Sequence, residues 1–292
     1  MSVITVGDFD GVHLGHRTLL RAVTDRAKEL GTESLVLTFD RNTKNALKGN
    51  NAGCLTDTRE RRELLLAEGI DRVAVVSFDE SFCNMSEKDF LEYLRVCYGC
   101  TDLFGGPDFR FGKGGAGFLT DGLVLEGIRQ HVVALKTDLV KISSTSIRTA
   151  LADGLIERAN TWLGHPYSIT GTVVEGKHLG RTIGFPTINV VPGEGKILPR
   201  NGVYITQTIA EGRVYASMTN VGTRPTVEDN AAKNAETHLL NGDGDFYGKI
   251  VTVRFLSRLR DEKHFTDIGA LMRQLRIDRE DAFRRHKEWA FM

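Results

Sequence analysis

The period of the hydrophobic pattern changes once along this chain of 292 residues, near residues 153–165. Before that point, short apolar runs alternate with segments whose apolar residues recur at helical spacing. After it, short extended segments separated by glycines follow one another. Domains of about 100–200 residues are usual, so the change predicts two domains, residues 1–158 and 159–292.

The first half has the spacing of βαβ units. Gly31 fits the end of the first helix, and Asp57 with Glu60 can form a capping box for another. We expect a parallel sheet with helices on both faces and ligands at the carboxyl ends of its strands. The expected strands are 3–6, 34–39, 72–76, 101–104 and 131–135, and the expected helices are 17–30, 57–69, 86–98, one opened by 141–148 and one ending at 163.

The second half has regular short strands with turn signals between them, which predicts an antiparallel barrel. An amphipathic segment at the C-terminus should form a helix that packs on this barrel. The expected strands are 168–174, 202–209, 213–220, 238–240 and 249–255, and the expected helix is 266–289.

Composition excludes several classes of protein. Lys plus Arg equals Asp plus Glu, 38 each, and this zero net charge argues against a general nucleic-acid binder. No apolar run approaches the roughly 18 residues of a membrane span, and the N-terminus enters a strand at once, so no signal peptide is expected. The four cysteines are too few for a disulfide framework, and Cys97 and Cys100 close a helix as structural thiols. We therefore expect a cytoplasmic protein.

The opening stretch, Gly7-Asp-Phe-Asp10-Gly-Val-His13-Leu-Gly15-His16, places two histidines in the first turn of a helix after a glycine turn. Backbone N–H groups and the positive end of the helix dipole favour phosphate there. Ser143, Ser144 and Thr145 open a second helix, and Arg148 adds a planar guanidinium one turn later. This set has donors and no evident catalytic carboxylate, which suits nucleotidyl transfer, since a phosphate nucleophile needs no base.

Two other interpretations of His13 and His16 stay open at this point. Histidines three residues apart can bind zinc, although no third ligand stands nearby in the sequence. They can also be purely structural. The order of strand, glycine turn and helix start favours the phosphate site.

A second stretch, Gly180-Arg181-Thr-Ile-Gly-Phe-Pro-Thr187-Ile-Asn189, puts a hydroxyl and an amide oxygen on alternate residues of an extended segment. Both then point to one face and can hold Mg²⁺. Gly176, Lys177 and Gly180 form a flexible flap that could cover phosphates. Glu236 could take the proton from a neutral alcohol, although alone it would more often be a solvated strand residue.

Together these stretches resemble the prokaryotic bifunctional riboflavin kinase/FMN adenylyltransferase (FAD synthetase) family over nearly the whole chain. The other residues that carry the resemblance are Gly106-Pro-Asp108-Phe-Arg110-Phe-Gly112, Ser143-Ser-Thr-Ser-Ile-Arg148, Leu163-Gly-His-Pro-Tyr167, Asn201-Gly-Val-Tyr204, Asn220-Val-Gly-Thr-Arg-Pro-Thr226 and Phe255-Leu-Ser-Arg-Leu-Arg-Asp-Glu-Lys263.

The resemblance implies a Rossmann-like nucleotidyltransferase domain followed by a six-stranded antiparallel riboflavin-kinase barrel with a C-terminal helix. It implies that ATP, riboflavin and FMN are substrates and that Mg²⁺ is the cofactor. The implied catalytic residues are His13, His16, Arg148 and Glu236, and Thr187 and Asn189 would hold the metal. Asp108, Arg110 and Arg260 would contact flavin, and the implied ATP contacts are Gly7, Phe9, Asp10, Gly15, Ser144, Thr145, Lys177, Gly180 and Arg181.

The departures from the family pattern fall in the N-terminal half. The family usually carries Asp-Pro-His-Pro after the second strand, where this chain has Asp40-Arg41-Asn42-Thr43. The basic residues after the Phe-Arg-Phe-Gly loop are thinned to Lys113-Gly-Gly-Ala-Gly117. The leading hypothesis is an enzyme that makes FMN and then FAD. The alternatives are a kinase with a weakened adenylyltransferase and a non-catalytic flavin carrier.

Overall fold

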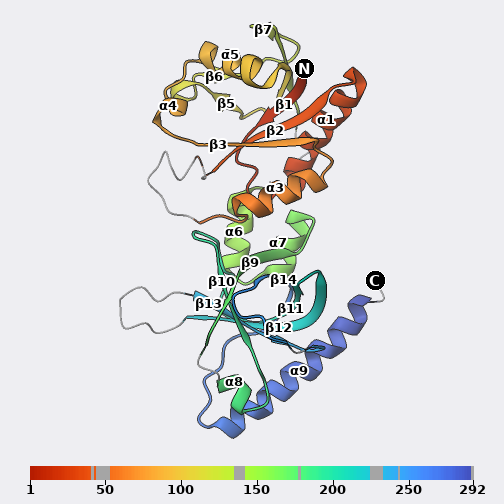
Figure 1. Cartoon of the computed structure of the whole chain (residues 1–292), viewed down its shortest axis with the longest axis vertical. Helices are drawn as coiled ribbons and strands as arrows, with labels where there is room; N and C mark the ends of the chain where they lie inside the picture. Colours follow the sequence, from red (N-terminus) through yellow and green to blue (C-terminus); the bar gives the residue numbers. More distant parts are fainter. Residues whose placement is uncertain are drawn as a thin grey trace. The chain divides into compact units, whose positions relative to one another are not determined.

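The computed structural model describes residues 1–40, 43, 53–134, 142–176, 179–223, 233–242 and 244–290. The chain divides into two compact units, Met1–Ser144 and Thr145–Met292 (Figure 1). The division expected after residue 158 stays a prediction.

The first unit is built around a six-stranded sheet in the order β3-β2-β1-β4-β8-β7, in which only the β7–β8 pair is antiparallel. The elements are β1 Ser2–Val6, α1 Leu14–Leu30, β2 Glu33–Phe39, α3 Thr58–Ala67, β3 Arg72–Val76, α4 Glu80–Cys83, α5 Glu87–Tyr98, β4 Cys100–Gly105, β5 Arg110–Phe111, a 3-10 turn Lys113–Gly115, β6 Gly117–Phe118, β7 Val124–Leu125 and β8 Ile128–Val132.

Alternation along the strands gives this sheet two buried faces. Val3 and Val36 lie on the face covered by α1 and α3, with Leu20 of α1 and Leu65 of α3 in the same cluster. The neighbouring residues of β1 and β2 face α5 and its buried Leu94. The predicted parallel sheet with helices on both faces is therefore confirmed.

Local sequence signals set most helix ends in this unit. Asp57 and Glu60 form the expected capping box, and Gly31 and Gly99 end α1 and α5 in the left-handed conformation that glycine adopts without strain. The expected strand 131–135 was wrong in its bounds. Strand β8 starts at Ile128, which is fully buried, and ends at Val132.

The second unit is a closed antiparallel barrel with strand order β10-β13-β12-β11-β14-β9, as predicted. Its elements are α6 Ser144–Ala152, which begins at the last residue of the first unit, α7 Ile156–Leu163, β9 Tyr167–Val174, α8 Leu179–Thr182, β10 Ile188–Pro192, β11 Gly202–Ala210, β12 Arg213–Thr223, β13 Lys233–Leu239, β14 Ile250–Arg260 and α9 Ile268–Ala290.

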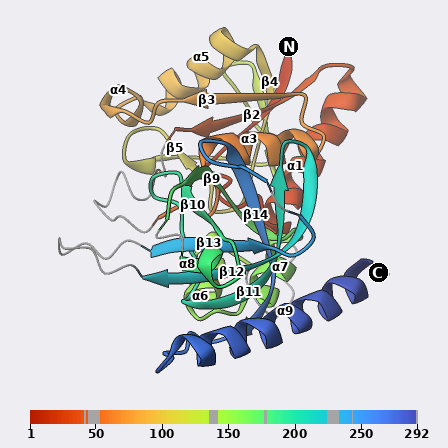
Figure 2. The ribbon, with the colours of Figure 1, turned by 60° about the horizontal axis from the view of Figure 1, so that its bottom comes forward.

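The barrel is covered on its outside by the C-terminal helix. Helix α9 lies along β11 and β12 (Figure 2) and buries Ala282 against Ile205, Met218, Leu256 and Phe185. The predicted packing of this helix on the barrel is confirmed. Sequence reasoning predicted an extended segment around Asn189 without counting it as a strand, and this segment is β10. Gly180 of the predicted flap lies in the short helix α8.

The inside of the barrel contains a chain of buried hydroxyl groups. Adjacent members lie 2.8–2.9 Å apart, so each hydroxyl has a hydrogen-bond partner without water. The members, in order of contact, are Thr208, Ser217, Thr206, Thr219 and Thr237.

A buried arginine joins the carboxyl ends of two strands in the first unit. Arg61 of α3 is 4% exposed and donates to the backbone oxygens of Asp8 (2.8 Å) and Phe39 (2.6 Å), which follow or end β1 and β2. Among the described residues, no carboxylate forms an ion pair with Arg61. Arg61 therefore fixes the spacing at the edge of the sheet where ligands are expected.

We predict that Arg61→Met lowers the free energy of unfolding of the first unit by about 2–4 kcal/mol, because the buried carbonyl oxygen of Phe39 loses its donor and that of Asp8 is left with the Thr38 hydroxyl at 3.2 Å. Calorimetry that resolves the two units should show this loss in one transition only. Arg59→Met is the control, since Arg59 is exposed on the same helix and pairs with exposed Glu63. Equal effects of the two substitutions would contradict the bridging role.

Candidate functional site

The turn after β1 is held in a strained conformation. Phe9 and Val12 have positive φ values of 47° and 40°, and Gly11 has one of 84°. Positive φ is costly for side chains other than glycine and persists where contacts enforce it. The enforcing contact is the carboxylate of Asp10, which accepts from the backbone N–H groups of Leu55 (2.9 Å) and Thr56 (3.0 Å). Asp10 is thus an anchor of the turn, and its contact with ATP stays a prediction.

The turn places His13 at the N-terminus of α1, where it is the N-cap residue of the helix. The backbone N–H of His16 donates to Nδ1 of His13 at 3.3 Å, and the two rings stack with centroids 3.6 Å apart. Because Nδ1 accepts, a neutral His13 ring carries its hydrogen on Nε2. Burial lowers the pKa of His13 to about 4, so the ring is neutral near pH 7. Gly15 lies in the same first turn.

A pocket of about 570 Å³ opens at the carboxyl edge of this sheet. Gly7 and Phe39 line it from the ends of β1 and β2, and further aromatic rings come from the segments that follow. Asp108 and Arg110 lie exposed at its border, where the Arg110 guanidinium stands 5.8 Å from the Phe118 ring centre. The aromatic residues of the lining are Phe39, Phe78, Phe82, Phe90, Phe109 and Phe111.

This pocket lies where the strand order reverses between β1 and β4, which is where open α/β sheets bind ligands. The structure therefore brings Gly7, Asp108 and Arg110 together around one apolar cavity. Within the described part of the chain, His, Cys, Asp and Glu side chains form no group of three or more that could hold a metal ion.

Helix α6 begins at Ser144, whose hydroxyl donates to the backbone oxygen of Asp10 at 3.0 Å. This bond attaches the predicted ATP contact Ser144 to the strained turn. Thr145 and Arg148 belong to the second unit, where Thr145 is exposed and Arg148 half-buried. Their predicted contact with ATP stays a prediction.

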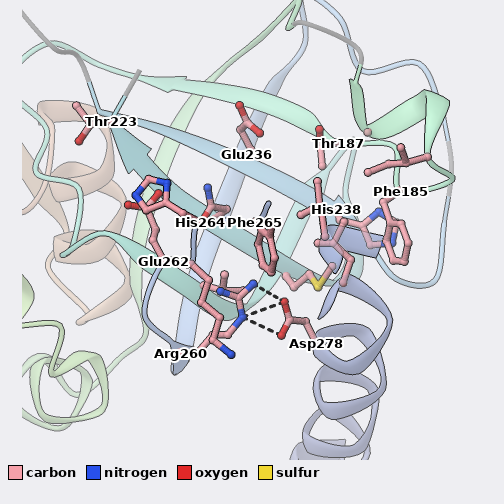
Figure 3. A pocket seen from close by; sticks show the side chains of 18 residues that line it. Phe185, Thr187, Thr223, Glu236, His238, Arg260, Glu262, His264, Phe265 and Asp278 are labelled. Carbon is pink, nitrogen blue, oxygen red and sulfur yellow. Dashed lines mark hydrogen bonds and ion pairs between the residues drawn. The ribbon is translucent and has the colours of Figure 1, made fainter. Parts of the chain in front are cut away.

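The second unit has a pocket of about 410 Å³ on the outside of the barrel (Figure 3). One wall is apolar and comes from the barrel, the segment after α8 and helix α9. Polar side chains of β13 and of the segment after β14 complete it. The lining includes Gly180, Phe185, Thr187, Met218, Asn220, Glu236, His238, Arg260, Phe265, Leu271, Leu275 and Asp278.

Strand pairing brings Asn189 and Glu236 opposite each other. Asn189 of β10 pairs with Glu236 of β13, and Asn220 of β12 pairs with Glu236 from the other side. Side chains directly opposite in a sheet have Cβ atoms about 5 Å apart, so Glu236 stands between two amides. The sequence predicted Asn189 and Glu236 separately, and the barrel places them together.

The fit of a metal ion to Thr187 and Asn189 is tested by two glycines. A Cβ on Gly176 would lie 2.1 Å from Nδ2 of Asn189, and one on Gly180 would lie 2.3 Å from the backbone oxygen of Phe185 and 3.4 Å from Oγ1 of Thr187. Any other residue would press on the Asn189 side chain and on the segment that carries Thr187. Hydroxyl and amide oxygens kept accessible by glycine suit a hard divalent cation.

Arg260 is held by a carboxylate that sequence reasoning missed. Asp278 of α9 is 2% exposed and accepts from Nε and Nη2 of Arg260 at 2.6–3.1 Å and from the Gln274 amide at 2.9 Å. In Figure 3 this pair lies on the other side of the pocket from Glu236 and Thr187. The sequence signal that could have identified Asp278 is that an acidic residue lies on the buried face of an amphipathic helix.

His238 shares a face of β13 with Glu236 and ties that strand to the segment before β10. Its Nδ1 lies 2.8 Å from the backbone oxygen of Pro186, next to Thr187. A carbonyl can only accept, so Nδ1 carries the hydrogen, and burial lowers the pKa of this histidine. His238 therefore presents Nε2 as an acceptor.

A neighbouring pocket of about 330 Å³ shares Thr187 with the first. Phe246 and Tyr247, which follow a glycine-rich loop, supply its aromatic wall. The sequence analysis did not single out either ring. Two pockets that meet at one hydroxyl can hold two substrates whose reacting ends adjoin it.

Several predicted residues lie outside what the structure describes. Lys177 is one, Arg41 and Asn42 of the altered triplet are others, and only the backbone of Arg181, in α8, is described. Thr43 is described, and its hydroxyl donates to the carboxylate of Asp8 at 2.7 Å.

Comparisons with known proteins match each half separately. The family model described as FAD synthetase matches residues 1–146, and the one described as riboflavin kinase matches residues 163–285. Among the described residues, no helix combines the length and apolar character needed to cross a membrane.

Similar proteins match nearly the whole chain. A bifunctional riboflavin kinase/FMN adenylyltransferase of Escherichia coli K12 is 36% identical over 94% of this chain and 90% of that protein. One of Listeria monocytogenes is 32% identical over 96% of this chain and 90% of that protein. A crystal structure from Streptococcus pneumoniae, reported as a macrolide-efflux protein, has a TM-score of 0.85 and 29% identity and covers 96% of this chain and 93% of that one.

The buried cap predicts a pH dependence of stability in the first unit. An unfolded histidine binds a proton below about pH 6.5, whereas folded His13 does so only below about 4. The stability from its neutral burial is full above pH 6.5 and falls by up to about 3 kcal/mol as the pH drops to 4. Denaturant unfolding of the first unit at several pH values measures this.

His13→Asn should remove this part of the pH dependence, because asparagine caps the helix without titrating. His264→Gln, at an exposed residue of the second unit, should leave the dependence as it is. The same pH slope in His13→Asn as in the unaltered chain would show that another group is responsible.

Proposed function

Because the chain belongs to the bifunctional riboflavin kinase/FMN adenylyltransferase family, we propose that its barrel makes FMN from riboflavin and ATP and its N-terminal unit makes FAD from FMN and ATP. One observation carries this function. The two family matches fall on different compact units, and each unit has its own pocket.

In the barrel, the larger pocket takes riboflavin and the smaller one takes ATP. The apolar side chains Phe185, Phe265 and Leu275 suit the flat ring system of a flavin, while Phe246 and Tyr247 offer faces for stacking adenine. The reacting ends of both substrates then meet beside Thr187, which lines both pockets.

Phosphoryl transfer from ATP to riboflavin needs a proton acceptor, since the attacking group is a neutral alcohol. Glu236 stands in the riboflavin pocket one strand from Asn189, and it takes the proton of the ribityl hydroxyl as the oxygen–phosphorus bond forms and ADP leaves. Arg260, held by Asp278, orients the flavin from the opposite side.

Enzymes of these two families generally need a divalent metal. We propose Mg²⁺, held in the barrel by the Thr187 hydroxyl and the Asn189 amide oxygen together with the phosphates of ATP. When bound, the ion neutralises negative charge on these phosphates. Gly176, Lys177, Gly180 and Arg181 would cover the phosphates.

Adenylyl transfer in the first unit needs no base, because the attacking phosphate of FMN is already anionic. His13, neutral with its hydrogen on Nε2, donates a hydrogen bond to the phosphate undergoing attack, and His16 stacks against it. The pocket at Gly7, Asp108 and Arg110 holds the flavin. Phe9, Asp10, Gly15, Ser144, Thr145 and Arg148 are the proposed surroundings of ATP.

We predict that the two reactions separate by mutation. Glu236→Gln should lower FMN formation about 100- to 10,000-fold through loss of the base and leave FAD formation from added FMN unchanged. His13→Ala should do the reverse, with a loss of about 100- to 1,000-fold. Chromatography of flavins after incubation with ATP and Mg²⁺ measures both reactions.

Each variant serves as the folding control for the other, because both reactions are carried by one chain. FMN formation by Glu236→Gln at the unaltered rate would refute the proposed base. If the unaltered protein binds flavin and forms neither product, it is a carrier and not an enzyme.

A further inference from the structure

Strand β13 carries an amide side chain, Asn234, that is neither one of the predicted metal ligands nor the predicted base. Asn234 lies two residues before Glu236, so both side chains project from the same face of the strand. Its Nδ2 donates to Oδ1 of Asn189 at 3.2 Å and to Oε1 of Glu236 at 3.2 Å. One amide thus joins a side chain of β10 to a side chain of β13.

The chemistry of the three groups fixes the orientation of this amide. Both of its neighbours present oxygens, so the NH₂ group must face them and the amide oxygen must face away. An amide nitrogen has two hydrogens, which match the two acceptors. The opposite orientation would place three oxygens together without a donor.

The bonds from Asn234 are compatible with the proposed roles of both acceptors. A carbonyl oxygen has two lone pairs, so Oδ1 of Asn189 can accept from Asn234 and also bind a cation. Asn234 bonds to Oε1 of Glu236, and the proton in the proposed reaction goes to the other carboxylate oxygen, Oε2. Asn234 itself neither gains nor loses a proton in such a reaction.

We propose that Asn234 is a positioning residue of the kinase reaction, which sets the metal-binding amide of Asn189 and the proton-accepting carboxylate of Glu236 in a fixed relation. The inference rests on the proposed function of the barrel. Asn189, the proposed metal ligand, lies on β10, and Glu236, the proposed base, lies on β13. The Asn234 amide would keep these two side chains in the geometry that phosphoryl transfer requires. A shift of about 1 Å at such a site costs about 100-fold in rate.

The test compares Asn234→Ala and Asn234→Ser with Asn84→Ala. Asn84 has an exposed amide that donates to the backbone oxygen of Glu80 at 3.0 Å in the first unit, so it controls for loss of one amide. Asn234→Ala should lower kcat for FMN formation about 10- to 100-fold, the range expected for a lost bond to a charged group. Asn234→Ser keeps one donor and should recover part of this loss.

A second measurement does not depend on turnover. Binding of Mn²⁺ with ADP, followed by electron paramagnetic resonance, should weaken about 10-fold in Asn234→Ala because Asn189 loses the group that orients it. FAD formation from FMN should stay unchanged in every variant. Fluorescence of Trp162 and Trp289, both in the second unit, shows whether the barrel is folded.

A folded Asn234→Ala protein with unchanged kcat and unchanged Mn²⁺–ADP binding would overturn the proposal. If Asn234→Ala does not fold, Asn234→Ser is the deciding variant. Unchanged kcat and unchanged Mn²⁺–ADP binding in Asn234→Ser would then overturn the proposal. Failure of the proposed function looks different, because Glu236→Gln would then make FMN at the full rate whatever Asn234 does.

Discussion

The position of β13 between β10 and β12 is the constraint on which the barrel site depends. It aligns Asn189, Glu236 and Asn220 in one row across three strands, and the Asn234 amide ties the first two together. A shift of one residue in either pairing would turn Glu236 toward the barrel interior, since side chains alternate along a strand. The chain of hydroxyls from Thr208 to Thr237 opposes such a shift, because buried hydroxyls would then lose their partners.

Both reactions use ATP, but the two units provide different functional groups for them, because the attacking nucleophiles differ. A phosphate brings its own charge, so in the proposed reaction the first unit supplies donors: a neutral His13 at the start of a helix and a strained turn anchored by Asp10. An alcohol must lose a proton, so the proposed kinase reaction uses a carboxylate that stands between two amides of the barrel. Joined in one chain, the product of one unit is the substrate of the other.

Sequence periodicity predicted most of the fold because most elements are long and regularly patterned. Helix α1, its glycine end and the capping box of α3 have local causes that the sequence displays. The missed elements are short or lack a pattern. Strands β5, β6 and β7 have two residues each, and Asn189 interrupts the apolar run of β10. For β8, buried Ile128 adjoins polar residues, so its start could not be seen from alternation.

The site was predictable only as far as residue type and strand face decide it. Thr187, Asn189 and Glu236 stand out because each has a chemical use, and their faces follow from spacing. Asn234 and Asp278 have no chemical role of their own that their residue type or spacing would reveal. Asn234 matters because strand register puts Asn189 within reach of its amide, and Asp278 because helix α9 packs beside Arg260. Register and helix docking are set by contacts between residues distant in sequence, and a residue whose role is to hold another can be recognised only after those contacts are known.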